Sequence, residues 1–142
     1  ALRPQPGDYT IIKPRWSAFF QTELDLILRR LDVRTVILAG TTTPNCVRTT
    51  CYDAIALEYN TVVLTDCCSS QTEEIQRVNL EDMERAGALL MDLRRLRARN
   101  GPGPLRRHPG GNAGLGCLPG ALRRPGGRRG LDGPLVRSAC RL

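Results

Sequence analysis

Residues 35–46 read TVILAGTTTPNC, and this stretch decides the fold. Its first five residues form a continuous apolar run that Gly40 ends. Such a run is typical of a strand buried on both faces, as in a parallel sheet. After the turn, apolar side chains recur at spacings of three and four over residues 45–57, which predicts a helix. A buried strand that leads through a turn into a helix is the repeating unit of α/β folds.

The sequence downstream repeats this unit. Residues 61–65 (TVVLT) predict a second buried strand. Residues 80–86 predict a helix, which could begin as early as Glu73. Residues 87–91 (GALLM) predict a short last strand.

The sequence upstream adds one more strand and one more helix. Residues 22–31 carry apolar side chains on one helical face. Residues 9–13 (YTIIK) are rich in β-branched side chains and stop at Pro14, which predicts a first strand. The alternation predicts an α/β fold, a Rossmann-like parallel sheet flanked by helices. Sites in such sheets lie at the carboxyl ends of the strands.

The chain changes character after Met91. Its 142 residues carry 21 Lys and Arg against 14 Asp and Glu, a formal net charge of +7. The positive excess lies in residues 92–142, which hold 12 Arg, 2 Asp and 11 of the 14 Gly, and no aromatic residue. Such a segment cannot bury enough apolar surface to offset its ordering entropy. We predict a folded domain over 1–91 and a tail that is disordered or read out of frame.

Composition also excludes several classes of protein. There is no apolar run of about 18 residues and no signal-like start, so neither a membrane span nor a leader is predicted. The six cysteines are too unevenly placed for a secreted disulfide scaffold and indicate a cytoplasmic protein. The only histidine, His108, lies in the tail, and Cys67 and Cys68 are adjacent, so no metal site or cofactor is predicted.

Two side chains are candidates for chemistry. Cys46 lies where the buried strand turns into a helix, where backbone N–H groups and the helix dipole favour a thiolate. The alternative is a small buried thiol that only packs. Lys13, the only lysine, is either a solvated charge or, if it lies near Cys46, a group that stabilises the thiolate and moves a proton. We interpret Cys51, Cys67 and Cys68 as structural.

Two motifs resemble those of the isochorismatase-like cysteine hydrolase family, which includes nicotinamidase, N-carbamoylsarcosine amidohydrolase and ureidoacrylate amidohydrolase. One motif is residues 13–19, KPRWSAF. The other is residues 40–48, GTTTPNCVR, which continues into Asp53 and Ala54. The resemblance extends over residues 9–88 and implies the fold of this family.

The resemblance implies a role for each candidate. Cys46 would attack an amide or ureido carbonyl and form a thioester that water hydrolyses. Lys13 would belong to the family's Asp-Lys-Cys triad. A cis peptide would lie between Thr41 and Thr42, and the N–H groups of Thr42 and Cys46 would form an oxyanion hole.

The resemblance also implies a small-molecule amide or ureido substrate, no cofactor, and a homo-oligomer for the intact protein. Trp16 and Phe19 could line the substrate pocket, with core packing as the alternative. The family's triad aspartate lies well upstream of Lys13, and Asp8 would lie about 16 Å from that lysine on an extended segment. The chain is therefore expected to match the C-terminal half of such a hydrolase and to be poorly active or inactive.

Three functional hypotheses remain. The first is a cysteine amidohydrolase of small amide, ureido or carbamoyl compounds. The second is an isochorismatase-type hydrolase of a vinyl ether, which needs no thiol, so Cys46 favours the first. The third is a non-enzymatic binding module that uses the basic tail. That tail has no aromatic side chain for base stacking and no lysine, so nucleic acid is not the favoured partner.

Overall fold

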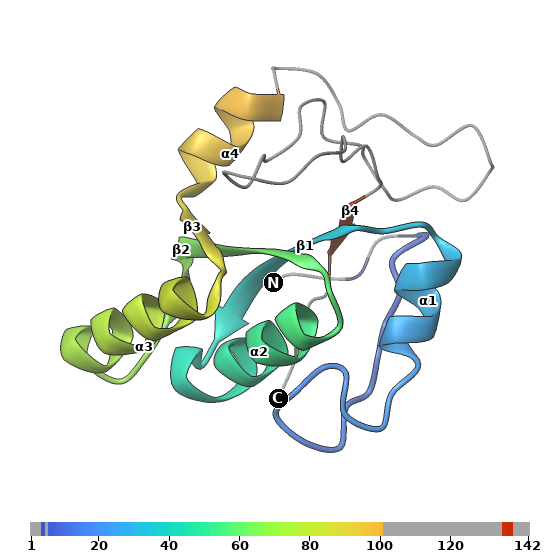
Figure 1. Cartoon of the computed structure of the whole chain (residues 1–142), viewed down its shortest axis with the longest axis horizontal. Coiled ribbons are helices and arrows are strands. Elements are labelled where there is room, and N and C mark those ends of the chain that lie inside the picture. Colours follow the sequence, from blue (N-terminus) through green and yellow to red (C-terminus); the bar gives the residue numbers. More distant parts are fainter. Residues whose placement is uncertain (1–3, 5, 101–134, 138–142) are drawn as a thin grey trace.

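The computed structural model describes residue 4, residues 6–100 and residues 135–137 (Figure 1). Helices and strands alternate through most of this part of the chain. In order, they are α1 (Leu24–Arg30), β1 (Thr35–Thr41), η1 (Thr43–Val47), α2 (Arg48–Ala56), β2 (Asn60–Ser69), α3 (Glu73–Ala86), β3 (Leu89–Met91), α4 (Leu93–Asn100) and β4 (Leu135–Arg137).

The strands form one sheet in the order β3-β2-β1-β4, and every pair is parallel. β1 and β2 are the central strands, and their apolar runs place side chains on both faces of the sheet. The predicted α/β fold, a Rossmann-like parallel sheet flanked by helices, is confirmed. The predicted strands at 35–39, 61–65 and 87–91 correspond to β1, β2 and β3.

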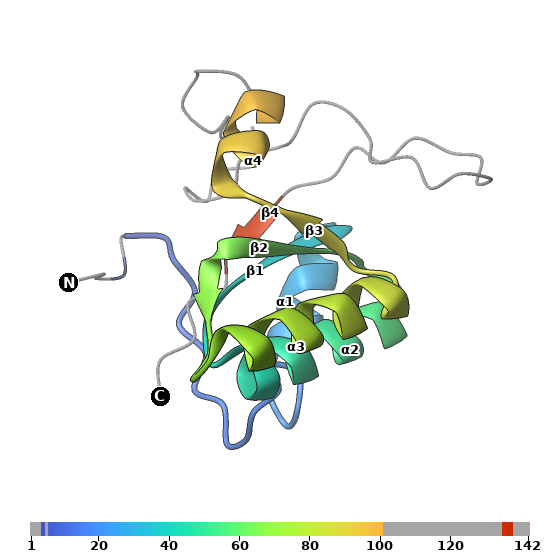
Figure 2. The same cartoon turned by 90° about the vertical axis from the view of Figure 1, so that its left-hand side faces the viewer.

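The helices α1, α2 and α3 cover one face of the sheet (Figures 1 and 2). Near the start of β1, Leu28 of α1 packs in a buried cluster with Val36 of β1 and Ala54 of α2. Further along the strands, a second buried cluster joins α2 and α3 to the sheet; it contains Leu38, Val47, Cys51, Val63, Met83 and Ala88. These clusters form the main core and fix α2 against β1.

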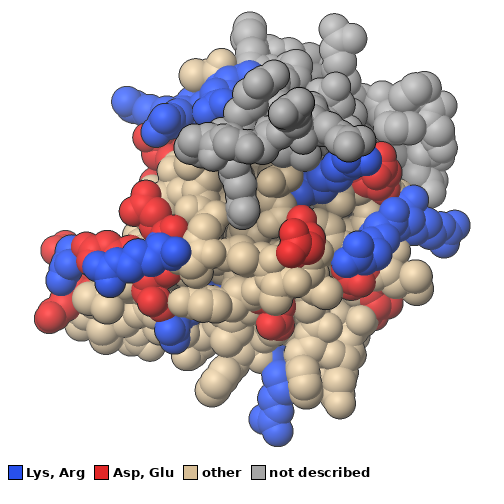
Figure 3. Space-filling view, in the orientation of Figure 1, with Lys and Arg blue, Asp and Glu red and all other residues tan. Residues whose placement is uncertain are grey.

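The opposite face carries α4, which the sequence analysis did not predict (Figure 2). Leu93 and Leu96, three residues apart, pack against Met91 and the other apolar side chains on this face. Asp92 caps the helix because its carboxylate accepts the N–H of Arg95 at 2.6 Å. Positively charged side chains gather over α4 in the space-filling view (Figure 3).

The strand predicted over residues 9–13 is wrong, because this segment has no regular secondary structure. An extended segment becomes a strand only when a neighbouring strand takes up its backbone hydrogen bonds. The described sheet ends at β4 on one side and β3 on the other, and residues 9–13 pair with neither. β-branched composition alone therefore gave the wrong result here.

Of the predicted tail, residues 92–142, the structure describes residues 92–100 and 135–137, which include α4 and β4. Residues 101–134 and 138–142 lie outside the described residues, so their predicted disorder or out-of-frame origin stays a prediction. Within the described ranges, no helix is both long and apolar enough to cross a membrane.

Candidate active site

The turn after β1 holds Cys46. The peptide bond between Thr41 and Thr42 is cis, and η1, a turn of π-helix, follows and runs directly into α2. Cys46 lies in this turn and is 3% exposed. The N–H groups of Asn45 and Val47 donate to the Thr42 carbonyl at 3.2 and 3.5 Å. The thiol thus lies at the N-terminal end of a helix and at the carboxyl end of a central strand, where parallel sheets carry their sites.

β2 supports this turn from the side. Its pairing with β1 is interrupted after Leu38 and resumes with Gly40 opposite Cys68. Gly40 has a φ of +136°, a conformation that other residues rarely adopt, which accounts for glycine at this position. The fully buried hydroxyl of Thr43 donates to the Ser69 carbonyl at 3.1 Å. These contacts fix the end of β1 before the chain reaches η1.

Lys13 and Cys46 meet although they lie 33 residues apart in the chain. Lys13 Nζ donates to Cys46 Sγ at 3.3 Å, to the Arg15 carbonyl at 2.9 Å and to the Trp16 carbonyl at 3.1 Å. An ammonium has three N–H donors, so these three acceptors satisfy it. None of the three is a carboxylate. The structure therefore brings together the two side chains predicted to be catalytic, and Lys13 has the thiol as its only side-chain acceptor among the described residues.

The two aromatic candidates lie in different environments. Trp16 is 58% exposed, and its carbonyl accepts from Lys13. Phe19 packs against the first buried cluster, where its ring stacks on Tyr59 with centroids 5.8 Å apart. The position of Phe19 fits the core-packing alternative. A role for Trp16 in a substrate pocket stays a prediction.

Sequence reasoning missed the polar residues that fasten the Lys13 segment to α2. Ser17 donates to Asp53, and the N–H of Ala18 donates to Thr50 Oγ1 at 3.0 Å. The available signal was the spacing of Thr50 and Asp53, four and seven residues after Cys46. Those spacings place all three on one face of a continuous helix.

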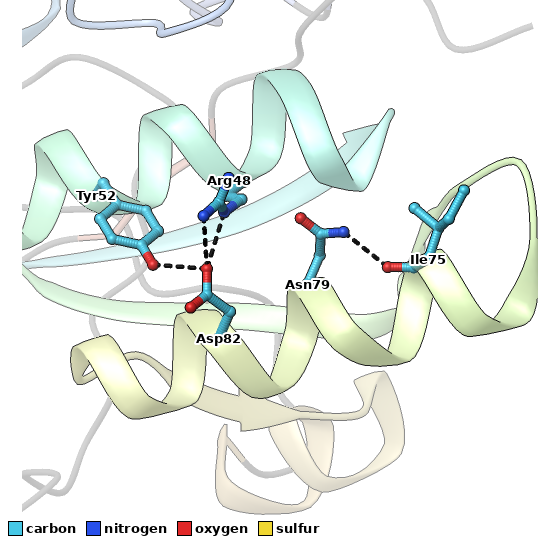
Figure 4. Close-up of polar contacts among 5 residues, drawn as sticks. All are labelled: Arg48, Tyr52, Ile75, Asn79 and Asp82. Carbon is cyan, nitrogen blue, oxygen red and sulfur yellow. Dashed lines mark hydrogen bonds and ion pairs between the residues drawn. The ribbon is translucent and has the colours of Figure 1, made fainter.

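A second polar network ties α2 to α3 and was also missed (Figure 4). Asp82 Oδ2 accepts from Arg48 Nε at 3.0 Å, from Arg48 Nη2 at 2.7 Å and from the Tyr52 hydroxyl at 2.8 Å. The Arg48 guanidinium also lies over the Tyr52 ring, 5.3 Å from its centroid. The hydrogen bonds from Tyr52 and then Arg48 lower the pKa of Asp82. The network holds the two helices together on the side exposed to solvent.

The described residues contain three other free thiols. Cys51 is fully buried between α2 and the sheet, and burial, with a further contribution from Cys68, raises its pKa to about 12. Burial raises the pKa of Cys68 to about 11. Burial and the nearby Asp66 raise the pKa of Cys67. These thiols stay protonated at neutral pH, which agrees with their structural interpretation.

Raised pKa values make the fold sensitive to alkaline pH. The pKa of Cys51 rises from 9.0 to about 12, and burial raises that of Tyr59 from 10.0 to about 12. Well below pH 9 both groups are neutral in the folded and unfolded chain, so their contribution to stability is fully present. As the pH rises further, they ionise first in the unfolded chain, and the free energy of unfolding is expected to fall progressively up to about pH 12.

Denaturant unfolding measured across alkaline pH tests this expectation. Cys51→Ala and Tyr59→Phe should each give a flatter dependence of the unfolding free energy on pH than the natural chain. Slopes are compared, because both substitutions also lower stability through lost packing or a lost hydrogen bond. Curves that run parallel to that of the natural chain would contradict the expectation.

No metal-binding group is found in the described ranges: nowhere do three or more His, Cys, Asp or Glu side chains gather to hold an ion.

The sequence matches known proteins over its first two thirds. The family model of the isochorismatase domain matches residues 1–95. A probable inactive nicotinamidase of Arabidopsis thaliana is 46% identical over 84 residues, which is 58% of this chain and 43% of that protein. A ureidoacrylate amidohydrolase of Pantoea ananatis is 46% identical over 65 residues, which is 46% of this chain and 26% of that protein. The chain spans less than half the length of these relatives.

Solved structures give the same result. An isochorismatase family protein from Desulfovibrio vulgaris matches with a TM-score of 0.66 and 43% identity, covering 67% of this chain and 50% of that chain. N-carbamoylsarcosine amidase from Thermoplasma acidophilum matches with a TM-score of 0.57 and 32% identity, covering 63% and 51%. Since the family model accounts for well over half of the sequence, and the fold agrees, the chain belongs to the isochorismatase family.

Proposed function

We propose that the protein is a cysteine hydrolase that cleaves a C–N bond of a small amide, ureido or carbamoyl compound through a thioester on Cys46. The observation that carries the proposal is the 3.3 Å contact between Lys13 Nζ and Cys46 Sγ at the head of α2. An ammonium in contact with sulfur stabilises a thiolate, which is the nucleophilic form of cysteine. Amidase relatives of known structure support the same class of reaction.

The proposed reaction has two stages. In the first, Cys46 Sγ attacks the carbonyl carbon while the N–H groups of Thr42 and Cys46 stabilise the oxyanion. Lys13 gives a proton to the leaving nitrogen, the C–N bond breaks, and ammonia or an amine departs. In the second, water attacks the thioester, its proton passes to Lys13, and the C–S bond breaks. The acid leaves, and the thiolate and ammonium are restored.

Turnover by residues 1–142 is expected to be low. The acceptors of Lys13 in the described residues are a thiol and two carbonyls. A carboxylate beside Lys13 would help it to cycle between ammonium and amine, and none accepts from it there. The first stage depends less on this help than the second does. We therefore expect the thioester to form and then to hydrolyse slowly.

The vinyl ether reaction is the alternative within the same family. It requires protonation of a double bond rather than attack by sulfur, so it gives no reason for a thiol in contact with an ammonium. The contact between Cys46 and Lys13 therefore favours amide chemistry. The binding-module hypothesis depends on residues that lie largely outside the described ranges, whereas the family match lies within residues 1–95.

A substrate panel tests the proposal. Purified residues 1–142 are incubated with primary amides, ureido acids, N-carbamoyl amino acids and a vinyl ether. Release of ammonia is followed, and intact mass with peptide mapping reports any acyl group on Cys46. We expect an acyl adduct on Cys46 with at least one amide or ureido compound. Hydrolysis of the vinyl ether alone, without an adduct, would establish the alternative instead.

The reactivity of Cys46 is expected to depend on Lys13. Lys13→Met removes the ammonium but retains a side chain of similar length, and should slow alkylation of Cys46 by iodoacetamide at neutral pH by about tenfold. Rates are measured at each cysteine by peptide mass spectrometry. Cys67 in the same molecule is the internal control, and its rate should not change. An equal rate at Cys46 in both proteins would show that the contact does not activate the thiol.

A further inference from the structure

The segment that carries Lys13 follows one face of the helix that carries Cys46. Residues 13–20 have no helix or strand hydrogen bonds of their own. Their position therefore depends on side-chain contacts with the rest of the fold. Cys46, Thr50 and Asp53 lie at helical spacing along η1 and α2, and residues of the segment contact each of the three.

Ser17 is the central contact of this segment. It is 6% exposed, its hydroxyl donates to Asp53 Oδ2, and its oxygen accepts the N–H of Phe19 at 3.1 Å. One residue further on, the N–H of Ala18 donates to Thr50 Oγ1, and Thr50 is 4% exposed. The contact between a hydroxyl and a carboxylate is the one charge-assisted bond among these, and bonds of this kind are the stronger ones.

The position of the ammonium follows from that of the segment. Lys13 Nζ donates to the carbonyls of Arg15 and Trp16, so the side chain folds back over the residues that lead into Ser17. A shift of the segment along α2 would move both carbonyls and the ammonium together. The bond between Ser17 and Asp53 lies seven residues along the same helical face from the thiol, so it is placed to hold the ammonium near Cys46.

We propose that Ser17 and Asp53 are positioning residues that hold Lys13 in contact with Cys46. This inference rests on the proposed function, in which the contact between Lys13 and Cys46 stabilises the reactive thiolate. Neither residue contacts the sulfur, and both act through the segment. Asp53 is the acceptor, and Ser17 links it to the backbone of the segment.

Alkylation of Cys46 tests the inference without requiring turnover. Ser17→Ala and Asp53→Ala should each slow alkylation of Cys46 by iodoacetamide at neutral pH, by about threefold to tenfold. In the Lys13→Met background, Asp53→Ala should cause no further slowing, because there is no ammonium left to position. Asp53→Asn retains an oxygen acceptor for Ser17 and should restore most of the rate. Tyr52→Phe, which removes a hydrogen bond from another part of α2, should leave the rate unchanged.

A general loosening of the fold would act in the opposite direction. It would expose Cys51, which is fully buried, and would speed alkylation at that residue. The inference is overturned if Asp53→Ala slows Cys46 equally with and without Lys13, or if it has no effect where Lys13→Met has one. If alkylation of Cys46 slows in Lys13→Met, Ser17→Ala and Asp53→Ala as expected, but no acyl adduct forms with any amide or ureido compound, the proposed function fails and the positioning role stands.

Discussion

Replacing Cys46 with alanine is expected to abolish the acyl adduct and to lower any amide hydrolysis on the order of 10³-fold or more. The proposed reaction forms its covalent intermediate on Sγ, and no second nucleophile contacts Lys13 among the described residues. The ammonium and the backbone N–H groups would remain, but neither can attack the carbonyl carbon as a nucleophile. The loss should therefore be in kcat rather than in substrate binding alone.

Intact mass spectrometry after incubation with a reactive amide measures the adduct directly. Cys51→Ala is the matched control, because it removes another buried cysteine from the adjoining helix and leaves the contact with Lys13 intact. It should retain the adduct, although its stability will be lower. An adduct of equal yield on the Cys46→Ala protein would locate the nucleophile elsewhere and refute the mechanism. Hydrolysis of a vinyl ether that survives Cys46→Ala would favour the alternative reaction of the family.

Periodicity predicted most of the fold because burial leaves a direct record in the sequence. β1 and β2 are central strands, so their side chains are apolar on both faces and form continuous runs. The two ends of α3 also carry signals that are visible in the sequence. Thr72 caps its start by accepting the N–H of Ile75, and Gly87 ends it with a φ of +113°. Such local signals are contained in a few neighbouring residues.

Features that depend on distant partners were not predictable in this way. Residues 9–13 have strand-like composition but no strand beside them, and composition cannot report a missing neighbour. α4 lies within a segment whose overall composition is that of a tail, although the spacing of Leu93 and Leu96 marks the side that packs on the sheet. Because the composition was averaged over the 51 residues 92–142, the signal of this short helix was lost.

The candidate site was predictable in part, and for two different reasons. Position alone singled out Cys46, because the carboxyl end of a buried strand is visible in the sequence. The contact between Lys13 and Cys46 joins residues that lie 33 positions apart in the sequence, so it could be expected only from the resemblance to a family. The hydrogen bond between Ser17 and Asp53 joins residues 36 positions apart, and neither sequence position nor the family resemblance predicted it. A hydrogen bond between such distant residues depends on how the segment packs against α2, and no local sequence pattern reports that packing.

Leu28→Ala is expected to lower the free energy of unfolding by about 3 kcal/mol. Leu28 lies on α1, is fully buried, and packs in the cluster that joins this helix to β1 and α2. Truncation removes three buried carbons and leaves a cavity that the surrounding side chains can fill only in part. A domain of this size has a total stability of about 5–15 kcal/mol, so the loss is a large fraction of the whole.

Leu26→Ala is the matched control, because Leu26 lies on the same helix and is 70% exposed. It should change stability by less than about 0.5 kcal/mol, and denaturant unfolding of both variants measures the difference. Similar losses in the two would show that α1 is not packed as described. Under native conditions neither substitution reaches the contact between Lys13 and Cys46, so the folded protein should alkylate at Cys46 at an unchanged rate. Stability and reactivity would then be separable: α1 contributes to the first, and the segment from Lys13 to Ser17 controls the second.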